Sequence, residues 1–224
     1  MPVDVDPLPK PTAVEALTVK LKSRILNGDF EPGAFLRDVK MADEYEVSRN
    51  TFRTAALALV SLGLLRQIVN RGFCVPEFGP DDIVDITRMR GVLEGEAVRM
   101  IVLNGTIPHG AVDAVRIMKE APRNAPSSLL AAADRDFHRA IIEAGGSPRL
   151  KLSYDSLEGE IELLLLQRQA HYHQPGEMLG EHETLLGAIR SRDFETARTA
   201  FVEHWDDLRI KLLRTQTRGG TRET

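Results

Sequence analysis

The chain of 224 residues contains a single cysteine, Cys74. One thiol excludes an intramolecular disulfide and the cysteine-rich zinc modules, and it fits a reducing compartment. Long apolar runs are also missing: the leucine run Leu163–Leu166, for example, has four residues, whereas a helix needs about 20 to span a bilayer. No signal peptide is recognisable. We therefore expect a soluble, cytoplasmic protein with no membrane partner.

A strong net charge is absent as well. The chain has 29 basic and 33 acidic side chains, which gives a formal net charge of -4. This balance excludes a basic protein that coats nucleic acid along its whole surface, so positive charge has to be sought locally. Residues 48–73 contain no acidic side chain and four arginines: Arg49, Arg53, Arg66 and Arg71. This window is electropositive within an acidic chain.

Residues 12–78 are predicted to form three short helices followed by a hairpin. Apolar side chains recur at helical spacing over residues 14–26, and EPGAFL indicates a turn into a second short helix. Ser48 is suited to cap a third helix over residues 49–62. Two strand-like runs, LLRQIV and GFCVP, flank a tight turn at residues 70–72. This order is typical of a winged helix-turn-helix domain.

Residues 79–214 are predicted to be entirely helical. Their first helix, residues 81–103, begins on two acidic residues and carries five residues at core spacing: Ile83, Ile86, Met89, Leu93 and Ala97. Gly105 and Pro108 break this helix, and the remaining breaks are PRNAPSS, GGSP and HQPGE. We count about six helices with short connections, which favours antiparallel neighbours around one core. We expect flexible tails at residues 1–11 and 215–224. The fold class is mainly α, with a winged domain before an antiparallel bundle.

The third helix and the hairpin carry the candidate DNA contacts. Arg49 and Arg53 stand four residues apart at the helix start, where arginine can read guanine. Arg71 at the hairpin tip can reach the DNA backbone or the minor groove. The alternative is that these arginines are solvated side chains on a helix face. The full candidate set is Arg37, Ser48, Arg49, Asn50, Thr51, Arg53, Asn70, Arg71 and Gly72.

Four residues of the C-terminal part have the types and placement of a metal site. Asp134 and His138 stand four apart in the helical stretch SLLAAADRDFHRAIIEA, so they share one helix face. His182 and His204 lie in two further amphipathic segments, each among apolar residues at helical spacing. Imidazoles on faces that point into a bundle need a partner. The alternative is that they are core histidines with ordinary hydrogen bonds.

The other three histidines are expected to be solvated. His171 and His173 lie beside a break at Gln174-Pro175-Gly176, and His109 lies at a helix start. We therefore leave them out of the metal set.

The run GDFEPGAFL...MADEYEVSRNTFRTAALALVSLGLLRQIVNRGFCV resembles the N-terminal domain of GntR-family bacterial regulators. The remainder resembles the helical FCD effector domain of their FadR-type branch, so the resemblance covers nearly the whole chain. It is carried by Pro32-Gly33, Val47-Ser48-Arg49, Phe52-Arg53, Gly63-Leu64, Asn70-Arg71-Gly72, Arg90, Leu93-Glu94, Asp134, Phe137-His138, Glu181-His182, Ala188-Ile189 and His204. The resemblance implies a homodimer on a pseudo-palindromic double-stranded DNA operator, released or recruited by a small organic acid.

The chain departs from the family pattern near the third helix. Glu46 stands where the family commonly has glycine, and Asn50-Thr51 stands where it has threonine-proline. The base contacts are therefore expected to differ. An acidic group beside the recognition helix is expected to weaken nonspecific phosphate binding.

The resemblance also implies the site in the bundle. The family's aspartate and three histidines match Asp134, His138, His182 and His204, and such donors suit zinc, with nickel or manganese as alternatives. An ion with open positions could bind the carboxylate of the acid. The resemblance places a pocket arginine at Arg90, whose alternative role is an ion pair with Glu94 on the same helix; both roles are compatible.

The function implied is a DNA-binding transcription repressor controlled by an organic acid. Two alternatives remain: a regulator whose signal is the metal ion itself, and a metal-dependent hydrolase. The hydrolase has the weaker basis, because the chain contains no HExxH pair, phosphate loop or nucleophile elbow. We expect no enzymatic activity.

Overall fold

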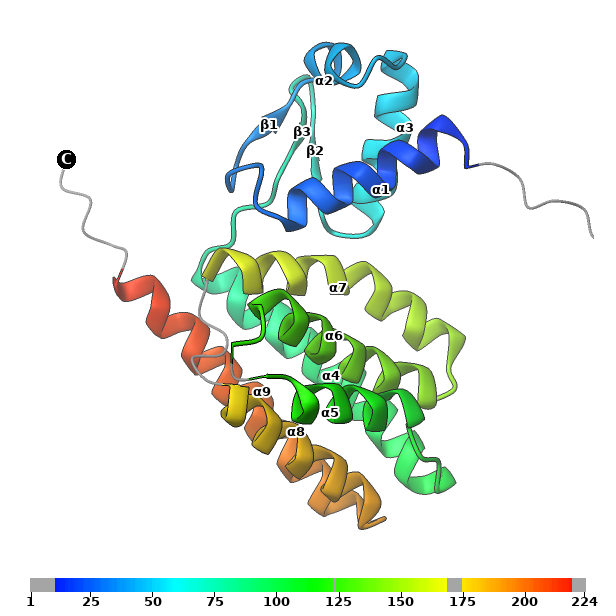
Figure 1. Ribbon diagram of the computed structural model, residues 1–224, viewed down its shortest axis with the longest axis vertical. Coiled ribbons are helices and arrows are strands. Elements are labelled where there is room, and N and C mark those ends of the chain that lie inside the picture. The colour runs from blue at the N-terminus through cyan, green and yellow to red at the C-terminus, as the bar shows by residue number, and fades with distance from the viewer. Residues whose placement is uncertain (1–10, 123, 169–174, 219–224) are drawn as a thin grey trace, which may run out of the picture. The chain divides into compact units, whose positions relative to one another are not determined.

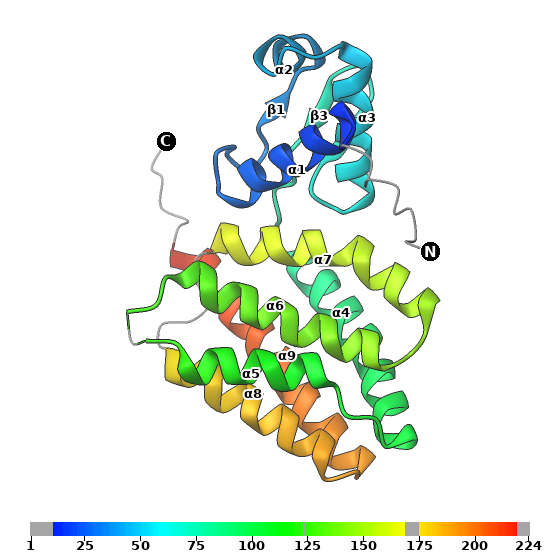
Figure 2. The same ribbon diagram turned by 45° about the vertical axis from the view of Figure 1, so that its right-hand side comes forward.

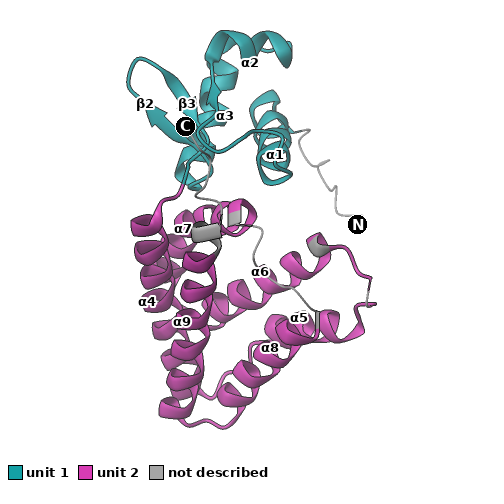
Figure 3. Ribbon diagram, turned by 90° about the vertical axis from the view of Figure 1, so that its left-hand side faces the viewer, with its two compact units in different colours: residues 1–77 teal, residues 78–224 magenta. Residues whose placement is uncertain are grey.

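A computed structural model of the chain describes residues 11–122, 124–168 and 175–218. The chain divides into two compact units, of which the first ends at Glu77 and the second begins at Phe78 (Figure 3). This division lies one residue from the boundary expected from the sequence. Residues 1–10 and 219–224, which belong to the expected tails, lie outside the described residues. Among the described helices, none is long and apolar enough to cross a membrane.

Unit 1 combines three helices with a small sheet (Figure 1). The helices are α1 (Ala13–Leu26), α2 (Asp38–Glu44) and α3 (Arg49–Ser61), and the strands are β1 (Phe35–Leu36), β2 (Arg66–Ile68) and β3 (Gly72–Cys74). Helix α1 packs on α3 through side chains that are almost completely buried: Leu17, Leu21 and Ile25 from α1, and Phe52, Ala55, Ala56 and Leu59 from α3. The predicted winged helix-turn-helix arrangement is confirmed.

The sheet of unit 1 has the strand order β1-β3-β2, and both pairings are antiparallel. Strand β1 was not predicted, because two residues are too few to show an alternating pattern. The β2–β3 turn places Asn70 at φ 61° and Gly72 at φ 93°, a conformation that favours asparagine and glycine. A Cβ atom on Gly72 would lie 3.2 Å from the carbonyl oxygen of Leu36. Gly72 therefore allows the hairpin to lie close to β1.

Among its described residues, unit 2 contains helices joined by short connections, and no strand. They are α4 (Pro80–Asn104), α5 (His109–Glu120), α6 (Ser127–Ala144), α7 (Pro148–Arg168), α8 (Pro175–Arg190) and α9 (Phe194–Arg218). Helices α7, α6, α5 and α8 form a row in Figure 2, and α4 and α9 pack along each other behind it. The six predicted helices are confirmed. Residues 215–218, expected in the C-terminal tail, continue α9 instead.

One face of α4 departs from the predicted core. The side chain of Met89 is 44% exposed, although its spacing assigned it to the apolar stripe. Arg90 and Glu94 are buried instead, at 2% and 0% exposure. Sequence periodicity identifies the buried side of a helix but does not show that a polar pair occupies part of it. The interior of unit 2 therefore contains charged groups that need partners.

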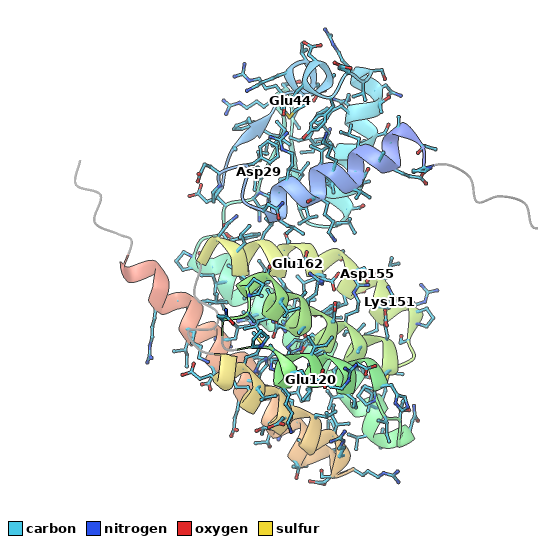
Figure 4. All side chains as sticks on the ribbon, viewed as in Figure 1. Asp29, Glu44, Glu120, Lys151, Asp155 and Glu162 are labelled. Atoms are coloured by element: carbon cyan, nitrogen blue, oxygen red, sulfur yellow. The ribbon has the colours of Figure 1, made fainter. Side chains whose placement is uncertain are left out.

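Ion pairs join α6 to α7 at the edge of the bundle. Figure 4 labels Lys151, Asp155 and Glu162 along α7. Arg135 of α6 lies 3.1 Å from a carboxylate oxygen of Glu162 on α7, and within α7 Lys151 Nζ lies 2.7 Å from Asp155 Oδ2. These pairs are partly exposed, so each is expected to contribute less than about 1 kcal/mol to the free energy of unfolding.

Candidate DNA interface and metal centre

The start of α3 presents polar side chains to solvent. Ser48 caps the helix, because its Oγ accepts a hydrogen bond from the Thr51 backbone N–H at 3.0 Å. Arg49 and Asn50, the first two residues of α3, are exposed, while Thr51 is half-buried. The side chain of Arg49 is accordingly available to a ligand in solution.

A groove in unit 1 lies between the start of α2 and the β2–β3 hairpin. Five of the nine candidate DNA-binding residues line it, together with a lysine that the sequence interpretation missed; the lining includes Arg37, Lys40, Arg53, Asn70, Arg71 and Gly72. Asp38 and Asp43 also line it. The acid-free window at residues 48–73 is therefore not an acid-free surface, because α2 brings two carboxylates beside its arginines.

Arg53 differs from Arg49 in being paired within the protein. Its Nη1 lies 2.5 Å from Asp38 Oδ2, and its guanidinium carbon lies 5.8 Å from the centre of the Phe73 ring. Asp38 also approaches the hairpin, since a Cβ atom on Gly72 would lie 3.5 Å from Asp38 Oδ1. Arg53 is therefore held in place by α2 and β3, and a DNA phosphate has to compete with Asp38 for it.

Glu46 lies just before α3 with φ 52°, in the left-handed region. This conformation explains why a glycine is common at the position in the family that the sequence resembles. The glutamate adopts it at a cost of about 1 kcal/mol.

The four predicted metal-site residues meet inside unit 2. Asp134 and His138 come from α6, His182 from α8 and His204 from α9, and all four are at most 8% exposed. Asp134 Oδ1 lies 3.0 Å from His182 Nε2 and 3.6 Å from His138 Nε2. One nitrogen from each of the three imidazoles lies within 4.8 Å of the other two. Residues up to 70 positions apart in the sequence thus converge on one point.

Four ring nitrogens of this cluster lack hydrogen-bond partners among the described residues. These buried atoms are His138 Nε2, His182 Nε2 and both ring nitrogens of His204. An unpaired buried polar group typically costs about 1–3 kcal/mol. Such a group of orphaned nitrogens fits a cation held between them.

The His182 tautomer leads to the same conclusion. Nδ1 of His182 lies 2.8 Å from the carbonyl oxygen of Met178, which can only accept, so Nδ1 carries the proton. Nε2 of the neutral ring is then a lone pair facing the Asp134 carboxylate at 3.0 Å. Two acceptors repel at that distance unless a cation lies between them. Donors about 2.1 Å from one ion, at 90–110° to each other, are separated by roughly 3.0–3.4 Å.

The other two imidazoles also have outer partners. His138 Nδ1 lies 2.9 Å from Glu94 Oε2, and His204 Nδ1 lies 3.4 Å from Glu181 Oε2. Glu181 also accepts a hydrogen bond from Lys211 at 2.8 Å. Carboxylates behind histidine ligands orient the rings and raise their basicity.

The pKa values of His204 and Asp134 favour a bound cation. Burial and Arg90 oppose protonation of His138, but Glu94 and Asp134 outweigh them and raise its pKa, so a cation has to displace a proton there. Burial lowers the pKa of His204 to about 4, despite the nearby Glu181 carboxylate, so its ring is neutral near pH 7 and can donate a lone pair. Burial opposes ionisation of Asp134, but the neighbouring imidazoles of His138 and His182 outweigh it and hold the pKa of Asp134 well below its usual value. A neutral imidazole beside an ionised carboxylate is the state that metal binding requires.

Arg90 and Glu94 form the buried ion pair considered from the sequence. Arg90 Nε donates to Glu94 Oε1 at 2.7 Å. Glu94 also accepts hydrogen bonds from Tyr154 and Trp205, which sequence reasoning missed. The adjacency of Trp205 to His204 was the available signal, because an indole N–H next to a buried ligand also needs an acceptor.

The remaining histidines can be placed only in part. His109 is the first residue of α5 and is exposed, as predicted. His171 and His173 lie outside the described residues.

Comparison with known proteins identifies both units. Residues 13–75 match the family described as bacterial regulatory proteins, gntR family, and residues 85–207 match the FCD domain. The chain is 30% identical to the uncharacterized HTH-type transcriptional regulator BphR of Paraburkholderia xenovorans, covering 81% of this chain and 78% of that protein. It is 28% identical to a probable D-xylose utilization operon transcriptional repressor of Paenarthrobacter nicotinovorans, covering 80% of each chain.

A solved structure is similar along almost the whole chain. It belongs to a GntR regulator from Rhodococcus sp. RHA1, with a TM-score of 0.72 and 25% sequence identity, covering 93% of this chain and 99% of that one. The similarity extends over both units.

Proposed function

Because the chain belongs to the GntR family of bacterial transcription regulators and carries an FCD domain, we propose that it is a repressor whose operator affinity is set by a small organic acid. The acid binds in the helical unit, next to a divalent metal ion. The relatives are transcription regulators and not enzymes, so the hydrolase alternative is dropped. Repression is supported by the relative named as a D-xylose operon repressor.

One observation supports the metal most directly: Nε2 of His138, Nε2 of His182 and both ring nitrogens of His204 are buried and have no hydrogen-bond partner among the described residues. We assign these histidines and Asp134 as the ligands. Three imidazoles and one carboxylate suit zinc, with nickel or manganese as the alternatives. The ion would act as a Lewis acid that attracts the carboxylate of the acid.

Arg90 is assigned to the acid as well. Its Nε is used by Glu94, but the two terminal nitrogens do not take part in that hydrogen bond. They can pair with a carboxylate in the manner that guanidinium groups favour. The ion-pair role and the ligand role of Arg90 are thus compatible.

Unit 1 is assigned to DNA. Arg49 is the base-reading arginine, because it is exposed at the start of α3 and Ser48 fixes the helix end next to it. Asn50 and Thr51 contact bases or phosphate from the same turn. Arg37, Arg53 and Lys40 face the backbone across the groove, and the hairpin of Asn70, Arg71 and Gly72 forms the wing contact. A regulator that acts on bacterial DNA works in the cytoplasm.

A homodimer completes the proposal. One recognition helix covers too few base pairs for high specificity, and a two-fold dimer matches two half-sites about one helical turn apart. Sedimentation of the protein, free and on DNA, tests it; a monomer in both conditions would exclude the dimer.

The whole proposal is tested by DNA binding under controlled metal content. A cognate duplex is first selected from random sequences with the zinc-loaded protein, and its affinity is then measured with acetate, lactate, succinate, citrate and the neutral sugar D-xylose. We expect one carboxylate to change the affinity of zinc-loaded protein and to have no effect on protein with His182→Ala. An effect of D-xylose alone would contradict an organic acid, and an effect of chelation alone would make the ion the signal.

A further inference from the structure

Glu94 lies at the centre of a buried hydrogen-bonded group on the side of His138 that faces away from the cluster. Its Oε1 accepts from Arg90 Nε at 2.7 Å and from the Tyr154 hydroxyl at 3.2 Å. Its Oε2 accepts from His138 Nδ1 and from Trp205 Nε1, both at 2.9 Å. A carboxylate has about four lone-pair positions, and four donors fill them. Glu94 therefore has no freedom to turn.

These donors determine the tautomer of His138. The guanidinium of Arg90 is always charged and lies 2.7 Å from Glu94 in the interior, so Glu94 is its ionised partner and can only accept. Nδ1 of His138 must then carry a proton when it bonds to Glu94. In the neutral ring, Nε2 is consequently the lone pair, and Nε2 is the atom that lies 3.6 Å from Asp134 Oδ1.

We propose that Glu94 is a positioning residue, which holds His138 in place for the metal ion and couples that ion to Trp205. This inference rests on the metal centre proposed above. Glu94 does not touch the ion. It fixes the tautomer and orientation of His138 and raises the basicity of that imidazole. Losing such an outer carboxylate typically costs about 10–100-fold in metal affinity.

Trp205 is seated where it can report this coupling. A Cβ atom on Gly91 would lie 3.1 Å from the indole Cε3, and one on Gly95 would lie 3.5 Å from Cη2, although the glycines themselves leave that room. Two glycines one helical turn apart on α4 thus accommodate the ring, while its N–H points to Glu94. The chain has one tryptophan, so all tryptophan emission comes from this position.

The coupling between His138 and Trp205 depends on one oxygen that both side chains contact, Glu94 Oε2. A cation on Nε2 of His138 withdraws electrons from the ring and makes Nδ1–H a stronger donor to Glu94 Oε2. The same oxygen accepts the indole N–H of Trp205, whose hydrogen bond weakens in response. Metal binding is therefore expected to change the emission of an indole that does not contact the ion.

The first experiment compares two buried glutamates. Glu94→Gln keeps the size of the side chain but places an amide against His138. Glu158→Gln is the matched control, because Glu158 is 5% exposed and pairs with Arg139 on the α6–α7 edge. Zinc affinity is measured by competition with a coloured chelator. We expect Glu94→Gln to lose about 10–100-fold, Glu158→Gln to lose less than about threefold, and Glu94→Asp, which retains the charge, to recover part of the loss.

A second measurement reads the tautomer directly. Nitrogen-15 spectra of labelled histidine are recorded for zinc-loaded wild-type protein and for metal-free protein along a series of rising pH, up to the point where the His138 signals stop changing. We expect His138 to be protonated at Nδ1 in both. Protonation at Nε2 in the metal-free protein would overturn the assignment, and this test remains available if Glu94→Gln does not fold.

Tryptophan emission completes the test. Zinc should shift the emission of wild-type protein and of Glu158→Gln, and it should leave Glu94→Gln unshifted at saturating zinc. Wild-type affinity in Glu94→Gln would reject the positioning role while leaving the metal centre intact. Failure of the wild-type protein to take up zinc, nickel or manganese would instead reject the metal centre, and the tautomer at metal-free His138 would still decide the role of Glu94.

Discussion

The two units place their functional groups in opposite environments. In unit 1 the side chains of Arg49, Asn50 and Arg71 are exposed, so water satisfies them until DNA arrives. In unit 2 the cluster of Asp134 and three histidines is buried, so these side chains are removed from bulk solvent. Exposed polar groups are common without a ligand, whereas buried ones need a partner. A ligand site is therefore far easier to infer from the structure of unit 2 than from that of unit 1.

The largest expected effect is that the metal ion stabilises unit 2 and leaves the stability of unit 1 unchanged. Zinc at about 100 times its dissociation constant should stabilise unit 2 by about 2.7 kcal/mol. For a unit of this size that corresponds to a melting temperature higher by roughly 5–11 °C. Calorimetry with and without a chelator measures it. His138→Ala should remove the shift, because it deletes a ligand, and the transition of unit 1 should stay in place. An equal shift in both units would break the comparison.

The next effect belongs to the exposed unit. Arg49→Ala should weaken binding to the selected operator duplex by about 1–3 kcal/mol, because a bidentate base contact is lost. Zinc uptake and melting should not change. Fluorescence anisotropy of labelled duplex measures the affinity. Unchanged operator binding by folded Arg49→Ala would remove the base-reading role.

Arg53→Ala sharpens the distinction between two arginines of one helix. It should weaken operator binding as well, but it also leaves Asp38 without its partner. Because Arg53 is 44% exposed, the resulting loss in the free energy of unfolding should stay below about 1 kcal/mol. Urea unfolding of Arg49→Ala and Arg53→Ala measures it, and equal stabilities would show that the Asp38 pair contributes nothing.

A further effect on the stability of unit 1 tests the cap of α3. Ser48→Ala should lower the free energy of unfolding of unit 1 by about 0.5–2 kcal/mol, because the Thr51 N–H loses its acceptor. Ser61→Ala, at the other end of the same helix, is the control, since its hydroxyl bonds only to the Ala58 carbonyl. Urea unfolding compares the two. Equal losses would show that the Ser48 cap has no special role.

The smallest effect concerns a histidine outside the cluster. His109→Ala should change zinc affinity not at all and the free energy of unfolding by less than about 0.5 kcal/mol, because the side chain is exposed at the start of α5. Zinc titration and urea unfolding measure both quantities. A weaker zinc affinity would mean that the buried set is incomplete.

The sequence predicted the features that depend on residues close together in the chain. Ser48 as a cap, Asn70 and Gly72 in a tight turn, and Asp134 with His138 on one helix face all follow from residues within four positions of each other. The convergence of His182 and His204 on that face was implied by the family resemblance, and the structure brings them together. The role of these residues stays a prediction.

Contacts between residues far apart in the chain could not be predicted from the sequence. The pairing of Arg53 with Asp38 joins residues 15 positions apart, and the bond from Trp205 to Glu94 joins residues 111 apart. Neither separation has a periodicity that a pattern could reveal. Strand β1 was missed for a different reason, since its two residues are defined by pairing with β3 and not by their own alternation.

The 111-residue separation of Glu94 and Trp205 has a consequence during synthesis. Ribosomes add about 5–20 residues per second, so Trp205 is made roughly 6–22 s after Glu94. Unit 1 has by then been translated in full, and its contacts, such as that of Arg53 with Asp38, join residues that lie close together in the sequence. Unit 1, which is assigned to DNA binding, is therefore complete while unit 2, which is assigned to the effector, is still being synthesised. During that interval a nascent chain can fold its DNA-binding unit before any effector can act on it.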